Sequence, residues 1–216
     1  MSDLIALLER GTIETLLMVG VAAPACALSG LAVGLLLTVT HPTGIAPSRS
    51  LYQAFSAITN ISRSIPFLIL IVLLLPVTRF LVGTSIGTAA AIVPLILGGI
   101  PYAGRLAESA LLEVDPGLIE AVVAMGATTR QAMFKAYLPE ALPSLFRAFT
   151  VLAITMINFS AMAGAVGGGG LGDLAIRYGY QRFRIDVLVG TVLILIALVQ
   201  GLQVGGNLLA RRLDRR

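Results

Sequence analysis

The chain has 216 residues, of which 57% are hydrophobic and only 12% charged, with a formal net charge of +4. A soluble domain carries about a quarter charged residues, so this composition excludes an ordinary soluble fold. It predicts an all-α integral membrane protein forming a single domain over residues 1–216. The small positive charge comes from clusters beside apolar segments, which indicates contact with lipid and excludes nucleic acid as a partner.

Cofactor chemistry is poorly supported by the residue types present. His41 is the lone histidine and Cys26 the lone cysteine, so neither a haem nor a multi-histidine metal site can be assembled from them. A membrane redox enzyme or hydrolase is therefore disfavoured, and Cys26 is expected to act as a small packing residue. We expect this chain to bind no cofactor and no metal of its own.

Five stretches are long and apolar enough to cross a hydrocarbon core, which needs about 20 residues per helix. Gly30 and Gly34 in the first are spaced so that helices can approach closely in lipid, and so are Gly201 and Gly205 in the last. The expected spans are 15–39, 51–75, 86–107, 141–166 and 185–209, with an amphipathic lead-in over 1–11 and loops over 76–87 and 164–184.

The second and third spans carry irregular features. Arg63 lies near the edge of the second span, where it either extends to the membrane interface, which we favour, or pairs inside the bundle. Pro94, Pro101 and the pair Gly98 and Gly99 are expected to break the regularity of the third helix.

The basic residues predict the orientation of the chain. Five spans place the termini on opposite sides, and cytoplasmic loops carry an excess of Lys and Arg. The N-terminus is therefore expected outside and the C-terminus in the cytoplasm of a bacterial cell. The predicted cytoplasmic side carries Arg49, Arg63, Arg105, Arg130, Lys135, Arg147, Arg211, Arg212, Arg215 and Arg216, against Arg10, Arg79, Arg177, Arg182 and Arg184 on the other.

Residues 113–138 interrupt the apolar sequence with frequent charges, which predicts short helices outside the hydrocarbon. Asp115 can cap the first of them, with Pro116 at its first position, where a missing N–H costs nothing. Gly126 suits the left-handed residue that ends this helix.

A second short helix is expected to follow directly. Thr128 and Gln131 have the three-residue spacing of a capping box, which marks its beginning. Leu138 and Pro139 are expected to end it, because proline cannot donate the next backbone hydrogen bond.

This segment resembles the EAA motif of ABC importer permeases, E-A-A-x-x-x-G-A with a downstream L-P-x-A-x-P; Val122 occupies the third position. The resemblance implies a cytoplasmic coupling helix that docks into a cleft on an ATP-hydrolysing subunit. Small alanines would allow close approach, and the glutamate would face a cationic partner. The alternative is an interfacial hairpin with no partner. The residues implied in coupling are Glu120, Ala121, Ala124, Gly126, Ala127, Leu138 and Pro139.

Nearly the whole chain, over residues 12–210, resembles the D,L-methionine permease subfamily. Phe159 replaces an expected tyrosine, and Gly104 an expected alanine. The resemblance implies a homodimer in the inner membrane, two ATPase subunits that use ATP and Mg, and an external methionine-binding lipoprotein. The matching stretches are 60–67, 83–87, 90–95, 110–114, 160–173 and 177–180.

Polar and soft side chains in the fourth span mark a candidate translocation pathway. Two of them, Asn158 and Ser160, point about 200° apart on a helix, so one can face the pathway and the other a neighbouring helix. Serine and threonine can instead bond to their own helix, and methionine can simply fill a core. The candidate pathway residues are Thr155, Asn158, Phe159, Ser160 and Met162.

Other functions lack the features they require. The sequence holds no Walker lysine loop, so ATP hydrolysis is expected in a partner. Gly167, Gly169 and Gly172 spell G-x-G-x-x-G, but no β-α-β unit surrounds them, and they are interpreted as turn glycines. An ion-driven secondary transporter would need acids within spans and internal repeats, whereas the acids here are expected near ends or in loops. Within the importer class, another small amino acid or a related sulfur compound is the alternative substrate.

Overall fold

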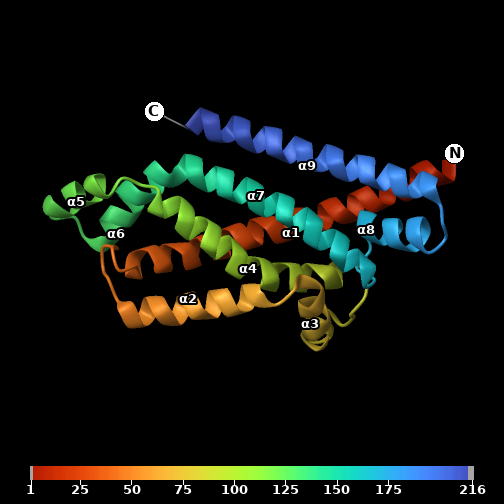
Figure 1. The fold of residues 1–216 in the computed structure, drawn as a ribbon, viewed down its shortest axis with the longest axis horizontal. Helices are drawn as coiled ribbons and strands as arrows, with labels where there is room; N and C mark the ends of the chain where they lie inside the picture. Colours follow the sequence, from red (N-terminus) through yellow and green to blue (C-terminus); the bar gives the residue numbers. More distant parts are fainter. Residues whose placement is uncertain (1, 214–216) are drawn as a thin grey trace. The chain divides into compact units, whose positions relative to one another are not determined.

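The computed structural model describes residues 2–213, and all regular structure within them is helical (Figure 1), which confirms the all-α prediction. Arg215 and Arg216, which were counted toward the predicted orientation, lie outside this range. The elements are α1 (Ser2–Thr40), α2 (Arg49–Ser64), α3 (Phe67–Val82), α4 (Thr88–Leu112), α5 (Pro116–Ala124), α6 (Thr129–Ala132), η1 (Met133–Tyr137), α7 (Leu138–Ala165), α8 (Gly170–Leu174), η2 (Ala175–Tyr180) and α9 (Ile185–Leu213), where η marks a π-helix.

Within the described residues, four helical stretches are long and apolar enough to cross a membrane, and the bent pair α2 and α3 makes a fifth if counted as one span. Large apolar side chains stay on the outside of these helices; Phe80, for example, is 88% exposed. Such a surface suits lipid rather than water. The four stretches are Asp3–Thr40, Thr88–Leu112, Thr129–Ala165 and Ile185–Leu213.

The second span differs most from its prediction, because the helix expected over 51–75 is interrupted. Pro66 lacks an N–H and disfavours the helical conformation of the residue before it, so α2 ends at Ser64 and α3 begins at Phe67. Pro76 lies inside α3, which continues to Val82, so the loop expected over 76–87 is much shorter.

Other predicted boundaries were also too narrow. The lead-in over 1–11 is part of α1 from Ser2 onward, and α4 passes through Pro94 and Pro101 without a break. The polar stretch expected as a loop over 164–184 is largely helical, as α8 and η2. In hydrocarbon every backbone polar group needs a partner, which favours helix wherever the side chains permit it.

The helices group into two compact units, and the expectation of a single domain stays a prediction. Helices α1, α4, α7 and α9 contribute residues to both. Unit one comprises Met1–Cys26, Ile65–Gly99 and Ala153–Gln203, and unit two comprises Ala27–Ser64, Ile100–Leu152 and Val204–Arg216.

Unit two contains the close helix contact predicted from glycine spacing. A Cβ atom on Gly30 would overlap the Cβ of Ala103, and one on Gly34 would lie 2.5 Å from the Cβ of Ala107. Only glycine therefore lets α1 approach α4 here. Gly201 and Gly205 have no such neighbour within 4 Å in the described chain; in unit two, α9 instead meets a side chain at Gly206, which faces Thr150.

Unit one contains a buried sulfur contact and a glycine turn. Cys26 is fully buried, as predicted, and its Sγ contacts the backbone oxygens of Leu95 and Ile96 at 3.7 and 3.5 Å. The glycine turn before α8 has positive φ at three positions, Gly167, Gly169 and Gly170.

Side chains from α1 fix the beginning of α8. The N–H of Gly170 donates to Oε2 of Glu14 at 2.8 Å, and that of Leu171 donates to Oγ1 of Thr15 at 2.9 Å. Because the first N–H groups of a helix lack partners within it, these two side chains serve as its cap.

Arg184, beyond η2, donates to Asp186 at 2.6 Å, and this hydrogen bond raises the pKa of Arg184.

Candidate functional site

The segment over 113–138 begins with the helix that its sequence predicts. Oδ1 of Asp115 accepts a hydrogen bond from the N–H of Gly117 at 2.8 Å, and Pro116 is the first residue of α5. The helix ends at Ala124, and Gly126 follows with a φ of +84°. A left-handed residue at this point turns the chain sharply without strain only when it is glycine.

The second short helix also begins as predicted but does not end there. Thr128 and Gln131 form a complete capping box, with bonds of 2.9 and 3.3 Å. The stop expected at Leu138 and Pro139 is wrong, because α6 runs through η1 into α7. In η1 the N–H of Leu138 bonds to the oxygen of Met133, five residues back. Bonding in this wider register just before Pro139 lets the helix accommodate its missing N–H.

A buried apolar cluster anchors this segment to unit two. One side of α5 and η1 packs on the ends of α4 and α7, so the segment is held firmly within its unit. The cluster consists of Ala107, Ala110, Leu111, Val114, Ile119, Met133, Ala136, Tyr137, Ala141 and Leu145.

The opposite side of the segment is exposed. Met125 is 79% and Phe134 57% exposed, an unusual display of apolar surface on a charged segment. All of the predicted coupling residues are exposed or half-buried: Glu120, Ala121, Ala124, Gly126, Ala127, Leu138 and Pro139. The structure thus brings the first five together on one small protrusion, with Leu138 and Pro139 at its return to α7.

A recess of about 500 Å³ lies beside α5. Glu120 and Ala124 line it from α5, Tyr137 lines it from η1, and Thr43 and Ile45 line it from the connection between α1 and α2. Its apolar walls and single carboxylate could receive a side chain of a partner protein, with a cation opposite Glu120.

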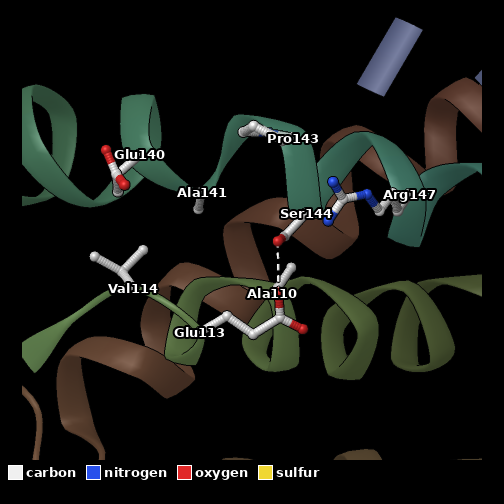
Figure 2. A pocket seen from close by; sticks show the side chains of 8 residues that line it. All are labelled: Ala110, Glu113, Val114, Glu140, Ala141, Pro143, Ser144 and Arg147. Carbon is white, nitrogen blue, oxygen red and sulfur yellow. Dashed lines mark hydrogen bonds between the residues drawn. The ribbon is translucent and has the colours of Figure 1, made fainter. Parts of the chain in front are cut away.

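A smaller pocket of about 120 Å³ lies where α4 and α7 meet the segment (Figure 2). Figure 2 shows Ser144 and Arg147 projecting from α7 and Glu113 reaching up from the end of α4. Oγ of Ser144 donates to Oε2 of Glu113 at 2.5 Å. This bond links the residue that follows α4 to α7, the helices that enter and leave the segment.

The candidate pathway residues divide into two groups on α7. Asn158 and Met162 are exposed and Thr155 is half-buried, and their spacing places them on one side of the helix. Phe159 instead stacks on Phe67, with ring centroids 4.1 Å apart. Ser160 is buried, and its Oγ donates to the oxygen of Ile157 at 2.8 Å, the bond to its own helix that the sequence left open.

One polar cluster in unit two was missed at the sequence level. Nη1 of Arg105 pairs with Oε2 of Glu108 at 2.6 Å, and Nη2 donates to the backbone oxygen of Ser56 at 3.0 Å and to its hydroxyl. Glu108 lies in the last turns of α4, near a helix end as expected, but it is buried, which was not expected. The sequence feature that could have revealed this cluster is the three-residue spacing of Arg105 and Glu108 beside an apolar span.

Arg63 lies in the same region. Its guanidinium carbon is 5.6 Å from the centroid of the Tyr102 ring, within the range of a cation–π interaction. Arg63 is exposed and contacts another helix of its unit, and its extension to the membrane interface stays a prediction.

Replacing Asp115 by alanine is expected to lower the stability of the segment by about 0.5–2 kcal/mol, because α5 loses its cap. Faster amide hydrogen exchange in 116–124 would show this. Asp115→Asn is the matched control, since asparagine caps as well as aspartate. Equal exchange rates in both variants would contradict the capping role.

The comparisons with known proteins fit this geometry. A family model described as "Binding-protein-dependent transport system inner membrane component" matches residues 30–216. The chain belongs to this family. It is therefore an inner membrane component of a binding-protein-dependent transport system, and the ion-driven secondary transporter is excluded as an alternative.

Relatives in this family cover nearly the whole chain. The "Probable D-methionine transport system permease protein MetI" of Vibrio cholerae is 50% identical over 210 residues, covering 97% of this chain and 93% of the relative. The "Methionine import system permease protein MetP" of Bacillus subtilis is 47% identical over 182 residues, covering 84% and 82%. A solved structure of inward facing conformations of the MetNI methionine ABC transporter shares the fold, with a TM-score of 0.97, 47% identity and complete coverage of both chains.

Proposed function

We propose that this chain is the permease subunit of an ATP-driven methionine importer. Two copies form the membrane pathway, and each docks on one of two ATPase subunits. An external lipoprotein delivers the amino acid. ATP and Mg are used by the ATPase, and this chain binds no cofactor and catalyses no reaction. The N-terminus lies outside and the C-terminus in the cytoplasm.

The coupling segment is the observation that carries this proposal. It is anchored on one side by a buried cluster and exposes Glu120, Ala121 and Ala124 on the other. The substrate is taken from the relatives, which are named for methionine transport at about half identity.

The attachment of the coupling segment to α7 accounts for how ATP binding drives transport. When the ATPases bind ATP and close, the docked segments move with them. Because α6 continues through η1 into α7, this displacement passes directly into α7, the helix that further along carries Thr155, Asn158 and Met162. Coupling of two sites needs such an element with two arrangements that both sites bias.

Reconstitution tests the proposal directly. The permease, its ATPase and its binding protein in proteoliposomes are expected to accumulate labelled methionine when ATP and Mg are supplied on the ATPase side. A non-hydrolysable ATP analogue is expected to support no accumulation. ATP-driven uptake of a different amino acid would support the assignment as an ATP-driven importer but reject methionine as its substrate. Methionine uptake without ATP would reject the assignment as an ATP-driven importer.

A further inference from the structure

A third cavity in unit two lies between α2 and α4. Its volume is about 370 Å³, within the range of small-molecule sites. Tyr52 and Arg63 line it from α2, and Tyr102, Arg105 and Glu108 line it from α4. It thus combines two guanidinium groups, one carboxylate and two aromatic rings.

Two charged side chains of this cavity are incompletely bonded. Among the described residues, Oε1 of Glu108 and Nε of Arg105 are buried and make no hydrogen bond. Glu108 is only 4% exposed, and its other oxygen is taken by Arg105. A buried charged group with an unused donor or acceptor is costly, so each of these atoms calls for a partner, which a bound molecule can supply.

The unused atoms are one acceptor and one donor, three residues apart on the same helix. The ammonium of an α-amino acid supplies the donor that Oε1 of Glu108 lacks. Its carboxylate supplies the acceptor that Nε of Arg105 lacks, with Arg63 as a second cation nearby. The rings of Tyr52 and Tyr102 offer an apolar wall, which suits an aliphatic or thioether side chain.

We propose that this cavity binds the head group of a zwitterionic α-amino acid, with its ammonium on Glu108 and its carboxylate on Arg105. The head group alone is specified by these residues. The choice of methionine as the probe rests on the proposed function.

The test uses the permease–ATPase complex in lipid nanodiscs without nucleotide, titrated with L-methionine by calorimetry. Glu108→Gln keeps the shape of the side chain and its bond to Arg105 but removes the negative charge. It is expected to weaken L-methionine binding by about tenfold or more. Glu113→Gln, five residues further along the chain and outside the cavity, is the matched control and is expected to bind as the wild type does. Recovery of the intact complex with the thermal unfolding temperature of the wild type shows that Glu108→Gln has folded.

Two analogues of methionine test whether Glu108 contacts the ammonium group of the ligand. The deamino analogue of methionine has no ammonium, so its weaker binding is expected to be the same in the wild type and Glu108→Gln. The decarboxylated analogue keeps the ammonium and is expected to lose affinity in Glu108→Gln as methionine does.

Equal binding of the imported amino acid by the wild type and Glu108→Gln would overturn the site, even if uptake is ATP-driven as proposed above. The site would also be overturned if the wild type bound neither methionine nor any other amino acid that the complex imports. Conversely, if the complex imports another amino acid whose binding is weakened by Glu108→Gln, the site stands and the substrate assignment fails.

Discussion

Replacing Gly126 by valine is expected to abolish ATP-driven uptake while the permease still inserts into the membrane. Gly126 has a φ of +84°, where a β-branched residue costs about 1–3 kcal/mol. A Cβ there would meet no atom within 4 Å, so the effect arises from the backbone alone. The turn between α5 and α6 is expected to open and displace Glu120 and Ala124 from the ATPase. Uptake and ATP hydrolysis are measured in the same proteoliposomes.

Gly83 provides a matched control for this variant. Its φ is +81°, and a Cβ atom added to it would also meet no atom within 4 Å, but it lies at the end of α3 in unit one. Gly83→Val is therefore expected to carry a similar backbone strain and to retain uptake. Glu120→Ala, which leaves the backbone unchanged, is expected to lower uptake per ATP hydrolysed. Wild-type uptake in both Gly126→Val and Glu120→Ala would refute the docking role.

Replacing Gly34 by valine is expected to destabilise unit two strongly. Its Cβ would lie 2.5 Å from the Cβ of Ala107 and 2.9 Å from the backbone nitrogen of Glu108. Because one of these neighbours is backbone, α1 and α4 must separate, and the cost is expected to exceed the roughly 1–3 kcal/mol of ordinary overpacking.

Thermal unfolding in detergent measures this effect. Gly20 lies on the same helix, and a Cβ atom added to it would have no atom within 4 Å. Gly20→Val is therefore the control and is expected to unfold near the wild-type temperature. A Gly34→Val protein as stable as Gly20→Val would show that the contact between α1 and α4 does not depend on glycine.

Features determined by a few adjacent residues could be predicted well from the sequence. Asp115, Gly126 and the pair Thr128 and Gln131 all take the capping or turning roles that their spacing indicates. Each role depends on side-chain-to-backbone bonds or backbone sterics within one helical turn, so tertiary structure has little opportunity to override it.

Proline effects were predicted less well, because they depend on what surrounds the missing N–H. Pro66 interrupts a helix, whereas Pro139 follows a π-helical turn and Pro94 and Pro101 lie inside α4. Residue type alone does not distinguish these cases. The length of a span that contains a proline is therefore uncertain from the sequence.

The partners of distant segments could not be predicted: the spacing of Gly30 and Gly34 indicated a close helix contact, but not that α4 makes it. Arg105 reaches Ser56, 49 residues away, and Glu14 reaches the N–H of Gly170, 156 residues away. The coupling residues were found because their motif is local. The cavity around Glu108 was missed because α2 and α4 assemble it only in the folded chain.

The burial of Cys26 has a practical consequence for locating the segments of this protein in a membrane. The only native thiol of the chain is fully shielded, so it is inaccessible to maleimide reagents while the protein is folded. A cysteine introduced at an exposed position, as in Met125→Cys, becomes the sole reactive group without prior removal of Cys26. Impermeant reagents added to one face of sealed vesicles then report the sidedness of each chosen position.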